Sequence, residues 1–179
     1  LTVYYKVEGF IYMPIEALAM AASNFIGQNI GAKNVDRVKK GKSLSMKMCV
    51  GMTVLIGGII MLFKTPILHI FTEEKEVVKY GSQFIMFIVP LYFIYAMNQI
   101  LSGVLRGAGK TFVPMIIGLV CMCGFRVGWL VVMMGIVKDV RIVYASYPLT
   151  WILTNIAMSI YYYKSSWIKK TTVERVEMV

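Results

Sequence analysis

Long apolar runs separated by short polar segments form the main pattern along the chain. Each run is near the roughly 20 residues that a helix needs to cross a bilayer, and none has the alternation of a barrel strand. Because lipid offers the backbone no hydrogen-bond partner, uninterrupted runs of this length indicate helices. The pattern predicts an all-α polytopic membrane helix bundle with about five transmembrane helices, at residues 3–30, 44–63, 79–104, 112–137 and 142–163.

The composition also indicates a membrane protein. Hydrophobic residues make up 58% of the chain and the mean hydropathy is +0.69, whereas soluble domains are about 45–50% apolar. The formal net charge of +10 comes from short basic clusters between the apolar runs. Nucleic-acid binding needs basic residues on one solvated face. We therefore expect the lipid bilayer as a partner, and no nucleic acid.

The first two polar segments differ in charge. Residues 31–43 hold five basic residues and one acid, whereas residues 64–78 hold two basic residues and three acids. An excess of lysine and arginine marks the cytoplasmic side of a membrane protein. This predicts a multi-pass plasma-membrane protein with its N-terminal end outside, a membrane domain over residues 1–165 and a cytoplasmic tail over residues 166–179.

The start of the chain favours a fragment. Leu1 is not an initiator methionine, and an apolar run follows almost at once without the pattern of a signal peptide. Transporters are often built from paired repeats, whereas the predicted number of helices is odd. We therefore expect that part of a longer protein lies upstream.

Three charged residues within the apolar runs are the candidates for cation coupling or buried charge: Glu8, Glu16 and Arg126. An arginine near mid-membrane costs about 2.5–3.5 kcal/mol, so Arg126 is expected to have a partner. At about 1.5 Å per residue, Arg126 and Glu16 both lie about 21 Å from the cytoplasmic side. We predict that they pair, with a role in transport or, alternatively, a purely structural one. Glu8 lies about 33 Å from that side, where headgroups or water would solvate it.

Amide side chains within the runs are the candidates for lining a polar cavity. They are Asn24, Gln28, Asn98, Gln99 and Asn155. The same arithmetic puts Asn24 and Asn98 about 9 Å from the cytoplasmic side, and hydrogen bonding between helices is their alternative role. The sequence shows no paired nucleophile and base and no metal-ligand spacing. We therefore expect neither an enzyme nor a metal site.

Two segments at the ends of predicted helices carry a family resemblance. The first reads Phe-Ile-Gly-Gln-Asn-Ile-Gly-Ala-Lys over residues 25–33, and the second reads Ser-Gly-Val-Leu-Arg-Gly-Ala-Gly-Lys-Thr over residues 102–111. In combination, and at this spacing, they resemble the multidrug and toxic compound extrusion (MATE) family. The motif residues are Gly27, Gln28, Asn29, Gly31, Ala32, Arg37, Arg106 and Gly107.

The resemblance implies a fold and an activity. Family members have two lobes of six helices, and the chain resembles the second lobe from its second helix to its last, so the first lobe is an expected partner. The implied function is a secondary active multidrug efflux antiporter. It would export small molecules, organic cations or xenobiotics, in exchange for Na+ or H+, with no cofactor besides that coupling ion.

One departure from the family and two alternatives accompany this implication. In the NorM-like branch an acidic residue precedes the Leu-Arg-Gly block within the third helix, whereas residues 83–105 contain no Asp or Glu. The coupling carboxylate of that branch is therefore not matched. The alternatives are a lipid-linked oligosaccharide flippase of the same wider superfamily and a non-transporting membrane interaction protein.

Overall fold

Helices make up nearly all of the chain that the structure, a computed structural model, describes, namely residues 2–136 and 140–164. No strand occurs within these ranges. The elements are α1 (Thr2–Gly31), α2 (Val35–Leu62), α3 (Lys64–Phe71), α4 (Lys75–Ile88), the 3-10 turn η1 (Val89–Leu91), α5 (Tyr92–Gly107), α6 (Phe112–Gly118), the π-helical segment η2 (Leu119–Phe125), α7 (Arg126–Ile136) and α8 (Val140–Lys164). The predicted all-α bundle is confirmed.

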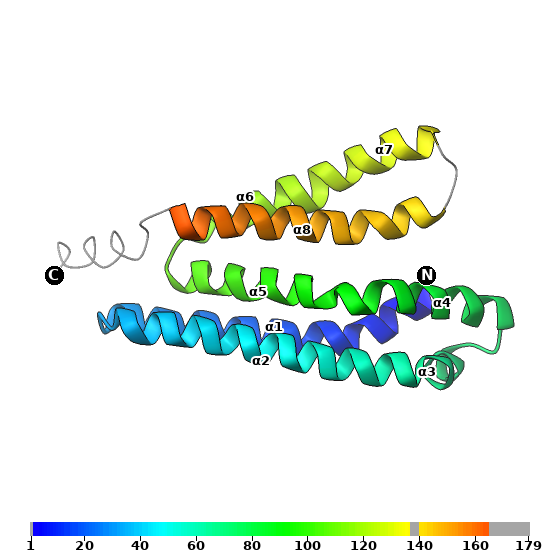
Figure 1. Cartoon of the computed structure of the whole chain (residues 1–179), viewed down its shortest axis with the longest axis horizontal. Helices are drawn as coiled ribbons and strands as arrows, with labels where there is room; N and C mark the ends of the chain where they lie inside the picture. The colour runs from blue at the N-terminus through cyan, green and yellow to red at the C-terminus, as the bar shows by residue number, and fades with distance from the viewer. Residues whose placement is uncertain (1, 137–139, 165–179) are drawn as a thin grey trace.

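Four helical stretches of the described chain are long and apolar enough to cross a membrane. They cover Lys6–Gly31, Val35–Leu62, Lys75–Gly107 and Phe112–Ile136. The fifth predicted span corresponds to α8, which has 25 residues and therefore the length of a crossing. Its proline, threonine, asparagine and tyrosine side chains make it more polar than the other four. It lies alongside α5 and α7 in the bundle (Figure 1).

The predicted loop at residues 31–43 is mostly helical in the structure, which corrects the predicted start of the second helix. α2 begins at Val35 rather than at Leu44. Asn34 caps this helix, because its side-chain oxygen accepts a hydrogen bond from the backbone N–H of Arg37 at 3.1 Å. Lysine and arginine are good helix formers, so they end the apolar pattern without ending the helix.

The third and fourth apolar runs both contain a change of helix type. η1, which contains Pro90, separates α4 from α5; proline lacks the N–H that a continuing α-helix needs. η2 separates α6 from α7 and ends directly before Arg126. π-helical turns are rare, and those that do occur are often found at functional sites.

Glycines bring α1 and α5 into close contact. A Cβ atom on Gly107 would lie 2.2 Å from the carbonyl oxygen of Ser23, and one on Gly103 would lie 2.4 Å from the carbonyl oxygen of Ala19. Gly103 and Gly107 form a GxxxG motif, which lets two helix backbones approach closely in a membrane. Gly107 was predicted only as a family-motif residue at a helix end, and this packing role was not predicted.

The two ends of the bundle differ in charge. The connections from α1 to α2 and from α5 to α6, together with the last residue of α8, lie at one end, and α3 and the start of α4 lie at the other (Figure 1). The first end carries the basic cluster of residues 33–42 with Arg106, Lys110 and Lys164, and the second carries Glu73, Glu74 and Glu76. Which membrane side each end faces remains a prediction, and the predicted tail at residues 166–179 lies outside the described residues.

Candidate functional site

Glu16 of α1 is held by two side chains of α5. Its carboxylate accepts hydrogen bonds from the Tyr95 hydroxyl, at 3.1 Å, and from the Gln99 amide. The Gln99 amide also donates to the Tyr95 hydroxyl oxygen at 2.8 Å. Tyr95 and Gln99 are four residues apart and therefore share one face of α5. The half-buried carboxylate is thus fixed at the interface that the GxxxG contact creates.

Glu8 lies inside the bundle, which corrects the expectation that headgroups or water would solvate it. Its side chain is 6% exposed, and its carboxylate accepts a hydrogen bond from the Tyr92 hydroxyl. Tyr92 is itself fully buried. Counting residues along α1 placed Glu8 near the membrane edge. The count could not predict that α5 positions Tyr92 against this carboxylate.

Aromatic rings surround the two acids. Tyr12, between them on α1, contacts the ring of Tyr92 at 5.7 Å and the ring of Tyr95 at 4.6 Å between centroids. Trp151 of α8 packs on Tyr92 at 5.2 Å and on Tyr95 at 5.5 Å. Aromatic faces are electron-rich and attract cations. We call this group the acid–tyrosine cluster; it consists of Glu8, Tyr12, Glu16, Tyr92, Tyr95, Gln99 and Trp151.

Arg126 contacts α8 instead of Glu16. Its Nη2 donates to the Thr150 hydroxyl at 2.9 Å, and its guanidinium lies 4.2 Å from the ring centroid of Tyr147. Its Nε is buried and has no acceptor in the described part of the chain. The predicted pair with Glu16 is therefore not formed among the described residues. Equal depth in the membrane is not enough for pairing, because it does not fix the direction in which each side chain leaves its helix.

The predicted polar layer of amides is not formed either. Asn98 is 1% exposed and donates to the carbonyl of Trp151 at 2.9 Å, while its own oxygen lacks a partner among the described residues. Asn24 and Gln28 are exposed on α1. Asn155 of α8 donates to the carbonyl of Ile94 at 3.4 Å. Asn98 thus makes the hydrogen bond between helices that was its alternative role, whereas Asn155 makes such a bond and also lines a groove between α5 and α8.

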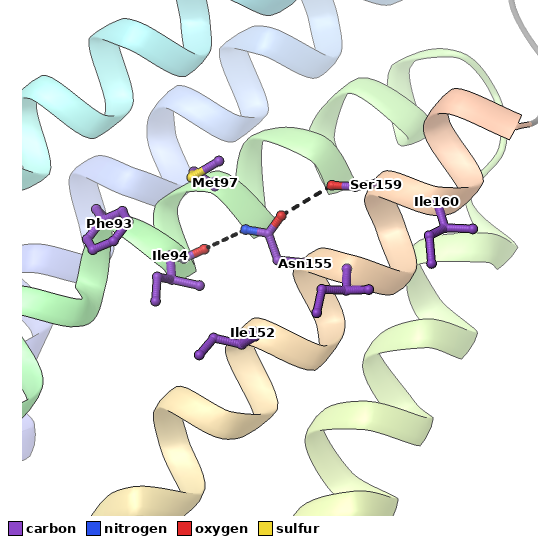
Figure 2. Close-up of a pocket in the computed structure, with 8 residues that line it drawn as sticks. Phe93, Ile94, Met97, Ile152, Asn155, Ser159 and Ile160 are labelled. Carbon is purple, nitrogen blue, oxygen red and sulfur yellow. Dashed lines mark hydrogen bonds between the residues drawn. The ribbon is translucent and has the colours of Figure 1, made fainter.

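An open groove of about 430 Å³ lies between α5 and α8 (Figure 2). Its lining from α5 includes Phe93 and Met97. These residues are each two positions away from Tyr95, and at about 100° per residue they point to the opposite face of α5. The groove is therefore separate from the acid–tyrosine cluster. Asn155 was one of the predicted cavity-lining residues and it lies in this groove. The other lining residues, apart from Ser159, are ordinary apolar positions of two helices, which the sequence pattern does not distinguish.

The two family-motif segments meet in the structure. A Cβ atom on Gly27 would lie 3.3 Å from the carbonyl oxygen of Gly107. The Asn29 side chain donates to the carbonyl of Phe25 at 2.8 Å and is 8% exposed. The other motif residues, Gln28, Gly31, Ala32, Arg37 and Arg106, are exposed at the basic end of the bundle. The motif therefore builds the helix ends and the α1–α5 contact, away from the acids.

The fold and the cluster define a polytopic helical membrane protein with carboxylates held between its helices, and comparison with known proteins identifies the family. The MatE family model matches residues 1–132. The chain belongs to this family, multidrug and toxic compound extrusion.

Its relatives carry corresponding names. The chain is 26% identical to "Probable multidrug resistance protein YoeA" of Bacillus subtilis over 178 residues, 96% of this chain and 37% of that protein. It is 30% identical to "Probable multidrug resistance protein NorM" of Thermotoga maritima over 116 residues, 63% of this chain and 24% of that protein. It is 28% identical to "Multidrug and toxin extrusion protein 2" of Mus musculus over 124 residues, 69% of this chain and 22% of that protein. The chain thus spans little more than a third of the length of these relatives, or less.

Proposed function

We propose that the chain forms part of a secondary active multidrug efflux antiporter, which exports organic cations or xenobiotics in exchange for Na+ or H+. Membership of the MatE family and the names of the relatives support the transporter class. The acid–tyrosine cluster supports a cationic cargo, because carboxylates beside aromatic faces attract positive charge. A first lobe completes the transporter, since alternating access needs two repeats that move against each other.

The contacts of Glu16 carry this proposal. Its carboxylate is held by a hydroxyl and an amide, and no basic side chain pairs with it in the described ranges. A negative charge that lacks a fixed counter-charge favours a mobile cation. Glu16 therefore serves as the coupling carboxylate, which a proton, a sodium ion or an organic cation neutralises in turn.

Neutralising Glu16 changes the contact between α1 and α5. An ionised carboxylate only accepts hydrogen bonds, whereas a protonated one also donates. Both present donors, Tyr95 and Gln99, come from α5. Protonation or cation binding therefore alters how strongly α5 is held to α1. This links occupancy of the site to a movement of helices, as an antiport cycle requires.

Efflux measurements on the complete transporter test the proposal. Proteoliposomes carrying Glu16→Gln are expected to lose export of a fluorescent organic cation driven by an imposed H+ or Na+ gradient. We expect a loss of about tenfold or more, within the usual range of coupling between sites. Glu76→Gln, an exposed acid in the first turn of α4, is the matched control. Export by Glu16→Gln at the rate of the control would overturn the role of Glu16.

The proposal also places the basic end of the bundle in the cytoplasm of a plasma-membrane protein. Ser43 of α2 is exposed close to that end. In a cysteine-free background, Ser43→Cys is expected to resist a membrane-impermeant maleimide in intact cells and to react after the membrane is opened. If Ser43→Cys were labelled in intact cells, the basic end would face the outside and the proposed orientation would be wrong.

A further inference from the structure

The α5–α8 groove is apolar, and its polar side chains already have partners. Asn155 and Ser159 lie in the groove; Asn155 donates to the carbonyl of Ile94 at 3.4 Å, and Ser159 donates to the Asn155 oxygen at 3.3 Å (Figure 2). The remaining lining residues are aliphatic, aromatic or methionine. A polar ligand would find few free hydrogen-bonding groups here, whereas a hydrocarbon chain needs none.

The groove continues as an apolar stripe to the basic end of α8. Ile152, Ile156 and Ile160 are four residues apart and lie on one face of the helix, with Tyr163 three residues further on. They are 43%, 52%, 51% and 75% exposed, in that order. From Ile152 to Lys164 the helix rises about 18 Å at 1.5 Å per residue. This length matches one leaflet, since the hydrocarbon core of a whole bilayer is about 30 Å thick.

Positive charge lies where the stripe ends. The ammonium of Lys42, on α2, lies 4.6 Å from the ring centroid of Tyr162 and 5.5 Å from that of Tyr163. Lys164 is exposed at the last position of α8. Basic residues at the end of a membrane helix attract anionic lipid headgroups. The groove thus combines an apolar track of one leaflet's length with a cationic end.

We propose that the groove between α5 and α8 binds an anionic phospholipid. One acyl chain lies along Ile152, Ile156 and Ile160, and the phosphate lies beside Lys42 and Lys164. This site is on the opposite face of α5 from the acid–tyrosine cluster, so the inference does not depend on the proposed transport function. It assigns to α2, α5 and α8 a lipid contact that is selective for headgroup charge.

Native mass spectrometry of the full chain, released from detergent micelles, tests the inference. The probes are phosphatidylglycerol and phosphatidylcholine with identical acyl chains. The unmodified chain is expected to retain more phosphatidylglycerol. Lys42→Ala is expected to lower that retention about fivefold, toward the level of phosphatidylcholine, since one lysine near the headgroup contributes roughly this factor. Lys47→Ala, an exposed lysine on the same helix, is the charge control.

Filling the groove tests the acyl-chain part of the inference. Ile156→Trp is expected to reduce retention of both lipids. Ile116→Trp is the matched control, because Ile116 is 53% exposed on α6, compared with 52% for Ile156, and is not a lining residue. Equal retention of the two lipids by the unmodified chain, or equal losses for Ile116→Trp and Ile156→Trp, would show ordinary boundary lipid and overturn the site.

A photoreactive lipid keeps the inference testable if the tryptophan variant does not fold. Phosphatidylglycerol with a diazirine in its acyl chain is bound to the unmodified chain, cross-linked by light and located by peptide mapping. Cross-links are expected on peptides that contain Phe93, Ile152 or Ile156. Labelling spread equally over these residues and the exposed Ile116 and Leu119 of the α6–η2 region would contradict a specific groove site.

Discussion

Adding one methyl group at Gly107 tests the α1–α5 contact on which the position of Glu16 depends. The new Cβ would lie 2.2 Å from the Ser23 carbonyl oxygen, whereas ordinary contacts begin at 3.4 Å. The two helices would therefore have to separate by about 1 Å. Overpacking of this kind costs about 1–3 kcal/mol. We expect the upper part of that range, because the obstacle is backbone and cannot rotate away.

The intrinsic helix preference of alanine offsets part of this loss. Alanine is favoured over glycine within a helix by about 0.8–1.0 kcal/mol. The net destabilisation expected for Gly107→Ala is therefore about 2 kcal/mol. The measurement is the free energy of unfolding in mixed micelles of a mild detergent and dodecyl sulfate, followed by circular dichroism.

Gly51→Ala supplies the control with the opposite sign. Gly51 is an exposed glycine within α2, and a Cβ atom there would have nothing within 4 Å. The substitution Gly51→Ala should therefore raise the free energy of unfolding by up to about 1 kcal/mol, through helix preference alone. If Gly107→Ala raised the free energy of unfolding as Gly51→Ala does, the close α1–α5 crossing would be refuted.

Four further substitutions test three individual contacts. Tyr92→Phe removes a donor from the buried carboxylate of Glu8 and should lower the free energy of unfolding by about 1–3 kcal/mol; an unchanged value would mean that this hydrogen bond adds no net stability. Asn34→Ala removes the N-cap of α2 and should lower the free energy of unfolding by about 1 kcal/mol. Amide hydrogen exchange should become faster in the first turn of α2 only. Thr150→Val leaves Nη2 of Arg126 without its acceptor and should lower the yield of folded protein, whereas Arg126→Leu removes the buried charge itself and should lower it less. Equal yields for these last two variants would count against the contact.

The sequence was sufficient to predict helices but not all of their boundaries. Apolar runs locate membrane helices because lipid demands both apolar side chains and internal backbone hydrogen bonds. The same signal stops at Lys42, although α2 continues back to Val35. The charged residues there lie on a helix that leaves the apolar layer, and hydropathy does not register such a segment.

The candidate site shows a second limit. Glu8, Glu16 and Arg126 stand out in the sequence, because charge within an apolar run is costly. Their partners do not, because Tyr92 and Thr150 are unremarkable positions in other helices. Depth along a helix is a matter of counting, but the direction of a side chain depends on how whole helices pack. That is why the pair of Glu16 with Arg126 was wrong while each residue was found to be buried or half-buried.

The π-helical segment η2 sets the direction in which the side chains of α7 face. A π-helical turn closes its hydrogen bond one residue later than an α-helical turn. Each residue corresponds to about 100° of rotation and 1.5 Å of rise. Arg126 is the first residue after η2, so its contact with Thr150 depends on this winding. If η2 rewound by a single residue, α7 would rotate by about 100° about its axis. The guanidinium of Arg126 would then leave α8 and point to another face, while the helices stay folded.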